Sequence, residues 1–234
     1  MGQYYRAVVK IGNKIDNIAN YIDGEYVMGK LMEQSWWDEH YVLQVASLLW
    51  RTRGKLAWVG DYANAGNLNW NEELSGVWDE KDSARRDLVY NGFTLDGIKF
   101  FFNHTKKEFI DLEEYKNIRI RKEKDKYLKT VNKNPDEISL SEYRKLVENK
   151  RMYLENPVSI LTAVGNGEGG GDYYSGAINA EKVGIWAWDT LEITDETPYE
   201  WDPAKRDIRL KDEFFDYKDA TKDYIFDEED IVEK

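Results

Sequence analysis

The stretch with the clearest potential for chemistry is the loop Gly165-Asn-Gly-Glu-Gly-Gly-Gly-Asp-Tyr173, which contains five glycines. Backbone amides that no side chain covers can approach a phosphate or another ligand, and glycine also reaches backbone angles that other residues avoid. We therefore expect a ligand-binding loop. Its candidate contacts are Gly165, Asn166, Gly167, Gly169, Gly170, Gly171, Asp172 and Tyr173. The alternative is a wide connection between two core strands, in which the glycines serve only the path of the backbone.

The flanks of this loop exclude the common nucleotide-binding motifs. Residues 165–170 satisfy G-x-G-x-x-G, but no helix is predicted after the loop and no βαβ alternation surrounds it, as a dinucleotide fold requires. No Lys-Ser or Lys-Thr pair follows it, which excludes a P-loop, and the catalytic motifs of a protein kinase are missing downstream. A ligand in this loop would have to be held in another way.

Three aspartates, Asp61, Asp172 and Asp189, stand next to apolar residues at predicted strand ends or loop mouths. If the strands that carry Asp61 and Asp189 are neighbours, all three carboxylates converge beside the glycine loop, as a general base or a metal site requires. Such a site would suit a carboxylate- or metal-dependent hydrolase of a nucleotide or a glycosidic bond. Acids at strand ends also cap turns, so a structural role is the alternative.

Other catalytic side chains are scarce. The chain has no Cys and two His, of which His40 lies in a predicted helix and His104 in a predicted hairpin turn. We therefore expect neither a His-based triad nor a zinc site, and we predict no metal and no cofactor. Trp186 and Trp188 could stack on a base or a sugar, but their spacing also suits a hydrophobic core.

The net charge of −12 is distributed unevenly along the 234 residues. Residues 115–134 hold eight Lys or Arg and two acids, whereas residues 189–234 hold seventeen acids and seven bases. The acidic end should repel nucleic acid, so we expect no nucleic-acid partner beyond a local, salt-sensitive contact of the basic stretch. The acidic end either keeps the chain soluble or presents a phosphate-mimicking surface to a nucleic-acid enzyme.

Hydrophobic periodicity predicts an α+β fold, a mostly antiparallel sheet with two main helices packed against it and a charged helical insertion. One helix is predicted to begin at the N-cap Ser35 and to end before Gly54, with an apolar stripe on one side. The other expected helices lie near residues 82–88 and after a capping box at Ser139 and Glu142. The expected strands span residues 3–11, 55–62, 98–103, 108–112 and 183–193.

In this scheme, residues 1–114 and 154–226 form a single α+β domain. Residues 115–153 are the charged helical insertion, and residues 227–234 are an acidic tail. The short apolar runs Phe214-Phe215 and Tyr224-Ile225-Phe226 are expected to pin the acidic C-terminus to the domain.

The segments Met1-Gly-Gln-Tyr-Tyr5, Trp58-Val-Gly-Asp-Tyr-Ala63, Leu161–Tyr173 and Val183–Asp189 resemble motifs of small uncharacterised proteins of bacteria and their phages. The resemblance implies no assigned activity. It does imply that the N-terminal strand, the strand end at Asp61 and the glycine loop belong together. The Lys-rich insertion and the acidic tail lie outside the resemblance.

These observations favour a non-enzymatic binding protein of bacterial or phage origin, such as a host-interaction or anti-defence factor. It would recognise a nucleotide-like ligand or a protein partner through the glycine loop. The hydrolase and the acidic inhibitor remain the alternatives, so enzymatic activity stays open. No run approaches the roughly 20 apolar residues of a membrane-spanning helix, and the N-terminus lacks the pattern of a signal peptide. We therefore expect no membrane partner and a location in the cytoplasm, the host cytoplasm if a phage encodes the chain.

Overall fold

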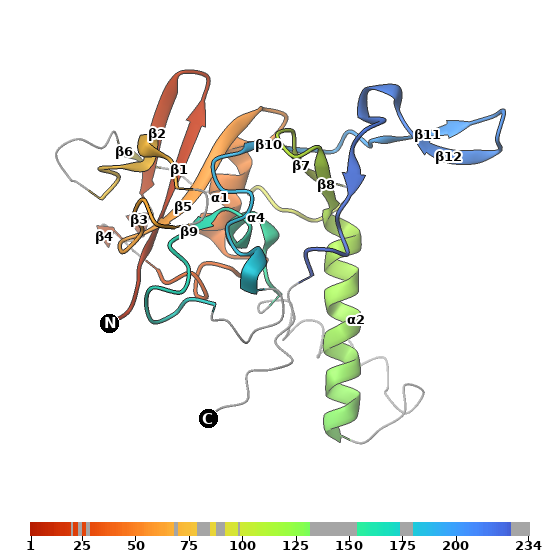
Figure 1. Ribbon diagram of the computed structural model, residues 1–234. Coiled ribbons are helices and arrows are strands. Elements are labelled where there is room, and N and C mark those ends of the chain that lie inside the picture. Colours follow the sequence, from red (N-terminus) through yellow and green to blue (C-terminus); the bar gives the residue numbers. More distant parts are fainter. Residues whose placement is uncertain are drawn as a thin grey trace.

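The computed structural model describes residues 1–19, 21–22, 25–26, 29–67, 70–78, 85–87, 92–97, 99–131, 154–173 and 180–225 (Figure 1). The predicted α+β fold is confirmed within these residues. The helices are α1 (His40–Leu48), α2 (Leu112–Val131) and α4 (Pro157–Ile160), with the 3-10 turns η1 (Glu72–Leu74), η3 (Ala180–Lys182) and η4 (Asp212–Phe214). The strands are β1 (Tyr5–Ile11), β2 (Lys14–Ala19), β3 (Tyr21–Ile22), β4 (Glu25–Tyr26), β5 (Gly54–Gly60), β6 (Arg85–Asp87), β7 (Phe100–Asn103), β8 (Glu108–Asp111), β9 (Ala163–Val164), β10 (Thr190–Thr194), β11 (Tyr199–Asp202), β12 (Asp207–Leu210) and β13 (Lys218–Asp219).

The main sheet has nine strands in the order β13-β8-β7-β10-β5-β1-β2-β6, and β9 pairs with β5 outside this order. Its pairs are antiparallel except β13–β8, β2–β6 and β5–β9. The hairpin of β11 and β12 forms a separate sheet that projects from the body beyond β7 and β8 (Figure 1). The short helix predicted near residues 82–88 is wrong. The structure describes residues 85–87 of this range, and they form β6, an extended strand that pairs with β2.

The N-terminal hairpin follows local sequence signals. Gly12 and Asn13 connect β1 to β2, and the φ of +60° at Gly12 favours glycine. Side chains alternate along β1, with Tyr5 in the main core and Val8 in a cluster on the opposite face of the sheet. β5 then pairs antiparallel with β1, with Tyr5 opposite Gly60, so the end of β5 lies beside the start of β1.

Helix α1 begins at His40, later than the predicted N-cap at Ser35 implies. The amide of Trp37 donates to the carbonyl of Leu154 at 2.6 Å. The backbone around Trp37 is therefore hydrogen-bonded to the segment before α4 and is not helical. Glu39 is the N-cap instead, because its carboxylate accepts a hydrogen bond from the backbone amide of Val42 at 2.8 Å. The predicted apolar stripe is confirmed, because α1 buries that face in the core.

Residues 183–189 form turns, so the predicted strand over residues 183–193 is wrong except in β10. Gly184 has a φ of +81°, and a Cβ atom there would lie 2.0 Å from the carbonyl oxygen of Ala163. Trp188 also has a positive φ, of +60°. The amide of Trp186 donates to the carbonyl of Leu161, directly after α4, at 2.7 Å. The alternating apolar residues of 183–189 are therefore buried on both sides of a segment whose backbone is not extended.

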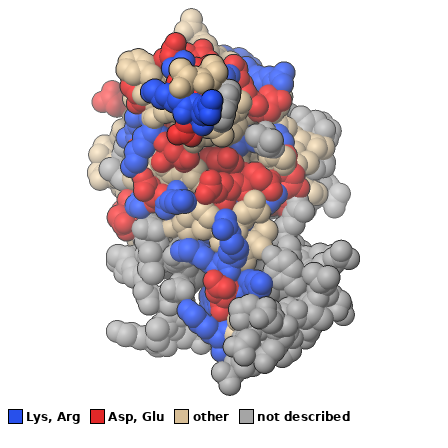
Figure 2. All heavy atoms as spheres, turned by 90° about the vertical axis from the view of Figure 1, so that its right-hand side faces the viewer, with Lys and Arg blue, Asp and Glu red and all other residues tan. Residues whose placement is uncertain are grey.

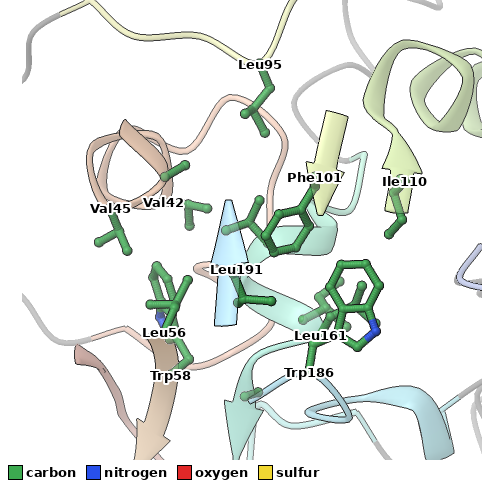
Figure 3. Packing of buried hydrophobic residues seen from close by; sticks show 14 of the residues in the cluster. Val42, Val45, Leu56, Trp58, Leu95, Phe101, Ile110, Leu161, Trp186 and Leu191 are labelled. Atoms are coloured by element: carbon green, nitrogen blue, oxygen red, sulfur yellow. The ribbon is translucent and has the colours of Figure 1, made fainter. Parts of the chain in front are cut away.

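The main core lies between one face of the sheet and α1. Figure 3 shows Val42 and Val45 of α1 facing Leu56 and Trp58 of β5, with Leu191 beside them. Smaller clusters cover the opposite face, one around β1 and β5 and one around β7 and β8. Trp186 and Trp188 are both buried, so their spacing reflects core packing.

Helix α2 begins in the core and then leaves it. Tyr115 is buried and stacks on Trp37, with ring centroids 6.2 Å apart. The rest of the helix carries the predicted basic residues and runs away from the sheet (Figure 1). Residues 132–153, with the predicted capping box at Ser139 and Glu142, lie outside the described residues. The domain boundaries therefore remain a prediction.

Residues 195–219, which we call the C-terminal arm, cover β7 and β8 on the face opposite α1. Phe214 stacks on Phe102 with ring centroids 5.0 Å apart, and Tyr224 and Ile225 are buried beyond the arm, as predicted. Phe215 is 77% exposed, so the prediction that it anchors the C-terminus is wrong. Phe226 lies outside the described residues.

Charge is segregated on the face that carries α2 and β8. Figure 2 shows a band of Asp and Glu side chains above the Lys and Arg side chains of α2. The hydroxyl of Tyr199 donates to Asp219 Oδ2 at 2.9 Å, and burial and the carboxylates of Asp219, Asp111 and Glu114 raise the pKa of this phenol. In the part of the chain that the structure describes, no helix is long and apolar enough to cross a bilayer.

Candidate functional site

The glycine loop is closed by its own aspartate. Asp172 Oδ2 accepts the amides of Gly167 and Gly169 at 2.9 and 3.0 Å, and Oδ1 accepts the hydroxyl of Tyr5 at 2.9 Å. The side chain is 1% exposed. Burial raises the pKa of Asp172, although the donors that it accepts act in the opposite direction. The amides that the sequence suggests for an external ligand are therefore occupied by an internal carboxylate.

Asn166 fastens the loop at its two ends. Its side-chain oxygen accepts the amide of Tyr173 at 2.8 Å, and its side-chain nitrogen donates to the carbonyl of the same residue at 2.7 Å. Gly165 and Gly167 have φ values of +94° and +95°, in the region that favours glycine. These two glycines thus serve the path of the backbone.

The first residues of the chain lie against this loop. The amide of Gly170 donates to the carbonyl of Met1 at 2.9 Å, and the amide of Gln3 donates to the carbonyl of Gly170 at 3.0 Å. Tyr4 and Asp61 are joined twice, by the Tyr4 amide to Asp61 Oδ1 at 3.2 Å and by the Asp61 amide to the Tyr4 carbonyl at 2.9 Å. The predicted meeting of the N-terminus, the strand end at Asp61 and the glycine loop is therefore confirmed.

Gln3 lies at the centre of this junction. Its side chain is fully buried, and neither its oxygen nor its nitrogen has a hydrogen-bond partner. A Cβ atom would lie 1.8 Å from Gln3 Nε2 if placed on Gly60, and 2.8 Å from the same atom if placed on Gly165. Glycines from two segments thus make room for one glutamine. A buried polar group without a partner costs about 1–3 kcal/mol, so its retention here requires an explanation.

The outer edge of the junction, which we call the loop rim, consists of Tyr4, Asp61, Tyr62 and Glu168. All four side chains are exposed, and the two tyrosines retain 39% and 37% of their accessible surface. The pKa of Tyr5 beneath them is raised by burial, by Asp172 and, to a smaller extent, by Asp61 and Glu168. The loop rim is therefore an aromatic surface with negative charge.

Asp189 does not belong to this junction. It precedes β10, which pairs with Lys55 at the start of β5, whereas Asp61 follows the end of β5. Six residues of extended strand separate the two ends by about 20 Å. Asp189 Oδ2 instead accepts the side-chain amide of Asn103 at 2.8 Å. The three aspartates therefore do not converge, although β5 and β10 are neighbours: Asp61 and Asp172 share the junction, and Asp189 supports the turn between β7 and β8.

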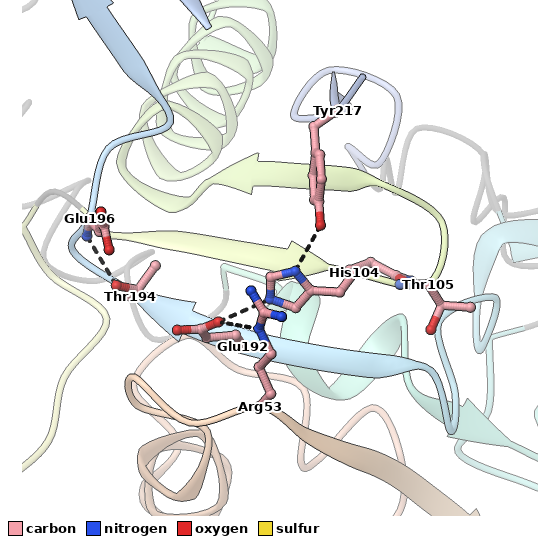
Figure 4. A network of polar contacts seen from close by, with 8 residues as sticks. Arg53, His104, Thr105, Glu192, Thr194, Glu196 and Tyr217 are labelled. Atoms are coloured by element: carbon pink, nitrogen blue, oxygen red, sulfur yellow. Dashed lines mark hydrogen bonds and ion pairs between the residues drawn. The ribbon is translucent and has the colours of Figure 1, made fainter. Parts of the chain in front are cut away.

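A second polar network surrounds His104, which the sequence suggests only as a turn residue (Figure 4). His104 Nδ1 lies 2.9 Å from the hydroxyl of Tyr217, and Nε2 lies 3.0 Å from Glu192 Oε2. Arg53 Nε lies 3.4 Å from the same carboxylate oxygen. The four residues come from distant parts of the chain, so only the tertiary fold brings them together. The one local signal is Glu192, an acid that alternates with buried residues in β10.

This network predicts that stability decreases as the pH falls through the histidine range. Burial and the charge of Arg53 lower the pKa of His104 below its ordinary 6.5, although Glu192 favours the charged form. The unfolded chain then binds this proton more readily, so the stabilisation is complete above pH 6.5 and is lost towards the folded pKa. We expect His104→Gln to flatten the dependence of the melting temperature on pH between about 7.5 and 5.5.

His40→Gln is the matched control, because His40 is exposed at the start of α1 and lies outside the network. It should keep the wild-type dependence of the melting temperature on pH. An unchanged dependence in His104→Gln would show that another group is responsible.

The junction and the His104 network each bring together polar side chains from distant parts of the chain. No group of three or more His, Cys, Asp or Glu side chains among the described residues is arranged to hold a metal ion. No family model matches this chain, and neither a curated protein nor a solved structure matches it.

Proposed function

We propose that this chain is a non-enzymatic binding protein that recognises a protein partner through the loop rim. The observation that carries the proposal is the exposure of Tyr4 and Tyr62 beside two carboxylates, above a loop that hydrogen bonds hold in place. Tyrosine supplies a large contact area and a polar hydroxyl with few rotatable bonds, and it is enriched at protein interfaces. Hydrogen bonds within the loop would limit the conformational entropy that binding costs.

A nucleotide-like ligand fits this surface less well than a protein does. The amides of Gly167 and Gly169 already donate to Asp172, so they are not available to a phosphate. Asp61 and Glu168 would also repel one. The hydrolase alternative loses the third of its three carboxylates, because Asp189 lies at the other end of β5.

The acidic band in Figure 2 favours a second candidate, the phosphate-mimicking inhibitor of a nucleic-acid enzyme. The two candidates use different residues, the loop rim in one case and the carboxylates around Tyr199 in the other. Neutralising Asp111, Glu114 and Asp219 should abolish binding by such an inhibitor and leave binding through the loop rim intact. The resemblance to bacterial and phage motifs leads us to propose a host-interaction or anti-defence setting, in the cytoplasm, for either candidate.

The proposal predicts that a photo-crosslinking amino acid at position 62 captures a specific protein in the source cell, identifiable by mass spectrometry. The purified partner should bind Tyr4→Ser/Tyr62→Ser at least about tenfold more weakly than the wild type, as expected for central interface tyrosines. Ile208→Ser/Phe215→Ser is the matched control, since it removes the two exposed apolar side chains of the C-terminal arm. Equal losses in both double variants, or a loss only in the control, would contradict the proposal.

A further inference from the structure

The junction gathers three carboxylates around one phenol. Asp172 accepts the hydroxyl of Tyr5 directly, at 2.9 Å. Asp61, which follows β5, and Glu168, which belongs to the same glycine loop as Asp172, also act electrostatically on this phenol. Glu168 is held in place by the side-chain amide of Asn67, which donates to it at 3.1 Å. Negative charge is therefore concentrated at one point by two segments, the end of β5 and the glycine loop.

No cation balances this charge within the described part of the chain, because no Lys, Arg or His there forms an ion pair with Asp61, Asp172 or Glu168. Lys30 lies beside the glycine loop, and its aliphatic carbons fill the space next to Gly171. Its ammonium group is turned to Glu33, at 3.6 Å. Among the described residues, the three carboxylates thus have no ion-pair partner.

Gln3 provides a second, independent observation. Its side chain is 0% exposed and points into the space between Gly60 and Gly165, and both of its polar atoms lack a partner. An amide oxygen can accept from a guanidinium or an ammonium group, as a carboxylate can. The buried amide and the exposed acids belong to the same junction, so one cationic group could use both.

We propose that the loop rim binds an arginine side chain of the protein partner, which deepens the function proposed above and rests on it. A guanidinium group is planar, stays charged, donates in several directions and stacks on aromatic faces. Asp61 and Glu168 supply the counter-charge, Tyr4 and Tyr62 supply exposed aromatic faces, and Gln3 supplies a further acceptor. A metal ion is the poorer fit, because the described carboxylates form no cluster with the geometry of a metal site.

The test uses the full chain and two short capped peptides, Gly-Arg-Gly and its citrulline analogue, which keeps the shape of arginine without its charge. Amide chemical shifts are followed by NMR as each peptide is titrated into the millimolar range. The arginine peptide should shift the amides of residues 165–171, and added salt should weaken binding. The citrulline peptide should bind at least about tenfold more weakly.

The variant Asp61→Asn/Glu168→Gln keeps both side-chain oxygens that accept hydrogen bonds, so it preserves the fold while removing two charges. It should weaken binding of the arginine peptide at least about tenfold. Glu72→Gln/Glu181→Gln removes two exposed charges elsewhere and should leave this affinity unchanged. Equal binding of the two peptides, shifts confined to other surfaces, or no shifts at all would overturn the inference.

Failure of the arginine site and failure of the proposed binding function give different results. If the crosslinked partner depends on Tyr4 and Tyr62 but binds Asp61→Asn/Glu168→Gln as well as the wild type, the binding function stands and the arginine site is wrong. If the arginine peptide binds the loop rim but the crosslinker at position 62 captures no partner, the site stands and the proposed function is wrong.

Discussion

Replacing Glu155 with glutamine is expected to lower the free energy of unfolding by about 4 kcal/mol, because Arg119 would then keep a buried charge without its counter-charge. Arg119 Nη2 lies 2.5 Å from Glu155 Oε2, and the two side chains are 3% and 2% exposed. Arg119 belongs to α2, and Glu155 lies in the segment that pairs with Trp36 before α1. The ion pair therefore joins α2 to the body of the domain, and urea unfolding monitored by tryptophan fluorescence would measure its loss.

Two further variants separate charge burial from lost contacts. Glu123→Gln is the matched control, since Glu123 lies 4.0 Å from Arg119 and is more exposed, so we expect it to cost at most about 1 kcal/mol. Removing both charges in Arg119→Met/Glu155→Leu should recover much of the stability, because an apolar pair can replace a buried ion pair at little cost. If the double variant is as unstable as Glu155→Gln, the loss does not come from an uncompensated charge.

The second large effect concerns the glycine loop. Asp172→Ala should lower the free energy of unfolding by about 3 kcal/mol, because it leaves two amides and the hydroxyl of Tyr5 without their acceptor. Asp172→Asn should cost less, since it retains an acceptor oxygen and burial already raises the pKa of the native carboxyl towards the neutral form. Chemical denaturation would rank the two variants, and hydrogen exchange should accelerate at the amides of Gly167 and Gly169.

Asp189→Ala is the control for this experiment. Asp189 also accepts a side-chain amide, but it is 18% exposed and lies at the other end of β5. We expect a loss of about 1 kcal/mol and no change in exchange at the glycine loop. Accelerated exchange at Gly167 and Gly169 in Asp189→Ala as well would show that the loop responds to general instability.

Local patterns in the sequence correctly predict the strands β1, β5, β7 and β8 and the apolar face of α1. The strands β1 and β5 and the hairpin of β7 and β8 are signalled by alternating side chains and by turn residues. The buried face of α1 follows from its apolar stripe. These features depend on residues a few positions apart, which is why the sequence alone suffices for them.

The errors arise where a distant segment takes the backbone hydrogen bonds. Ser35 has the composition of an N-cap, yet its neighbour Trp37 pairs with Leu154, so Glu39 caps α1 instead. Residues 183–189 alternate like a strand, but Gly184 lies against the carbonyl of Ala163. Periodicity reports which side chains are buried, and it carries no information about which backbone partner will be nearest.

In the candidate site, too, some features follow from the sequence and others from the tertiary structure. The sequence by itself determined the glycine loop, the aspartates and the α+β class, because glycine content, apolar spacing and turn residues are local properties. Only the tertiary structure decided that Asp172 fills the loop, that Gln3 lies unpaired among the glycines, that Asp189 lies elsewhere and that His104 meets Glu192 and Tyr217. The physical reason is that hydrogen bonds and charge interactions act over a few ångströms in space, whatever the separation along the chain, and the register of the sheet sets those distances.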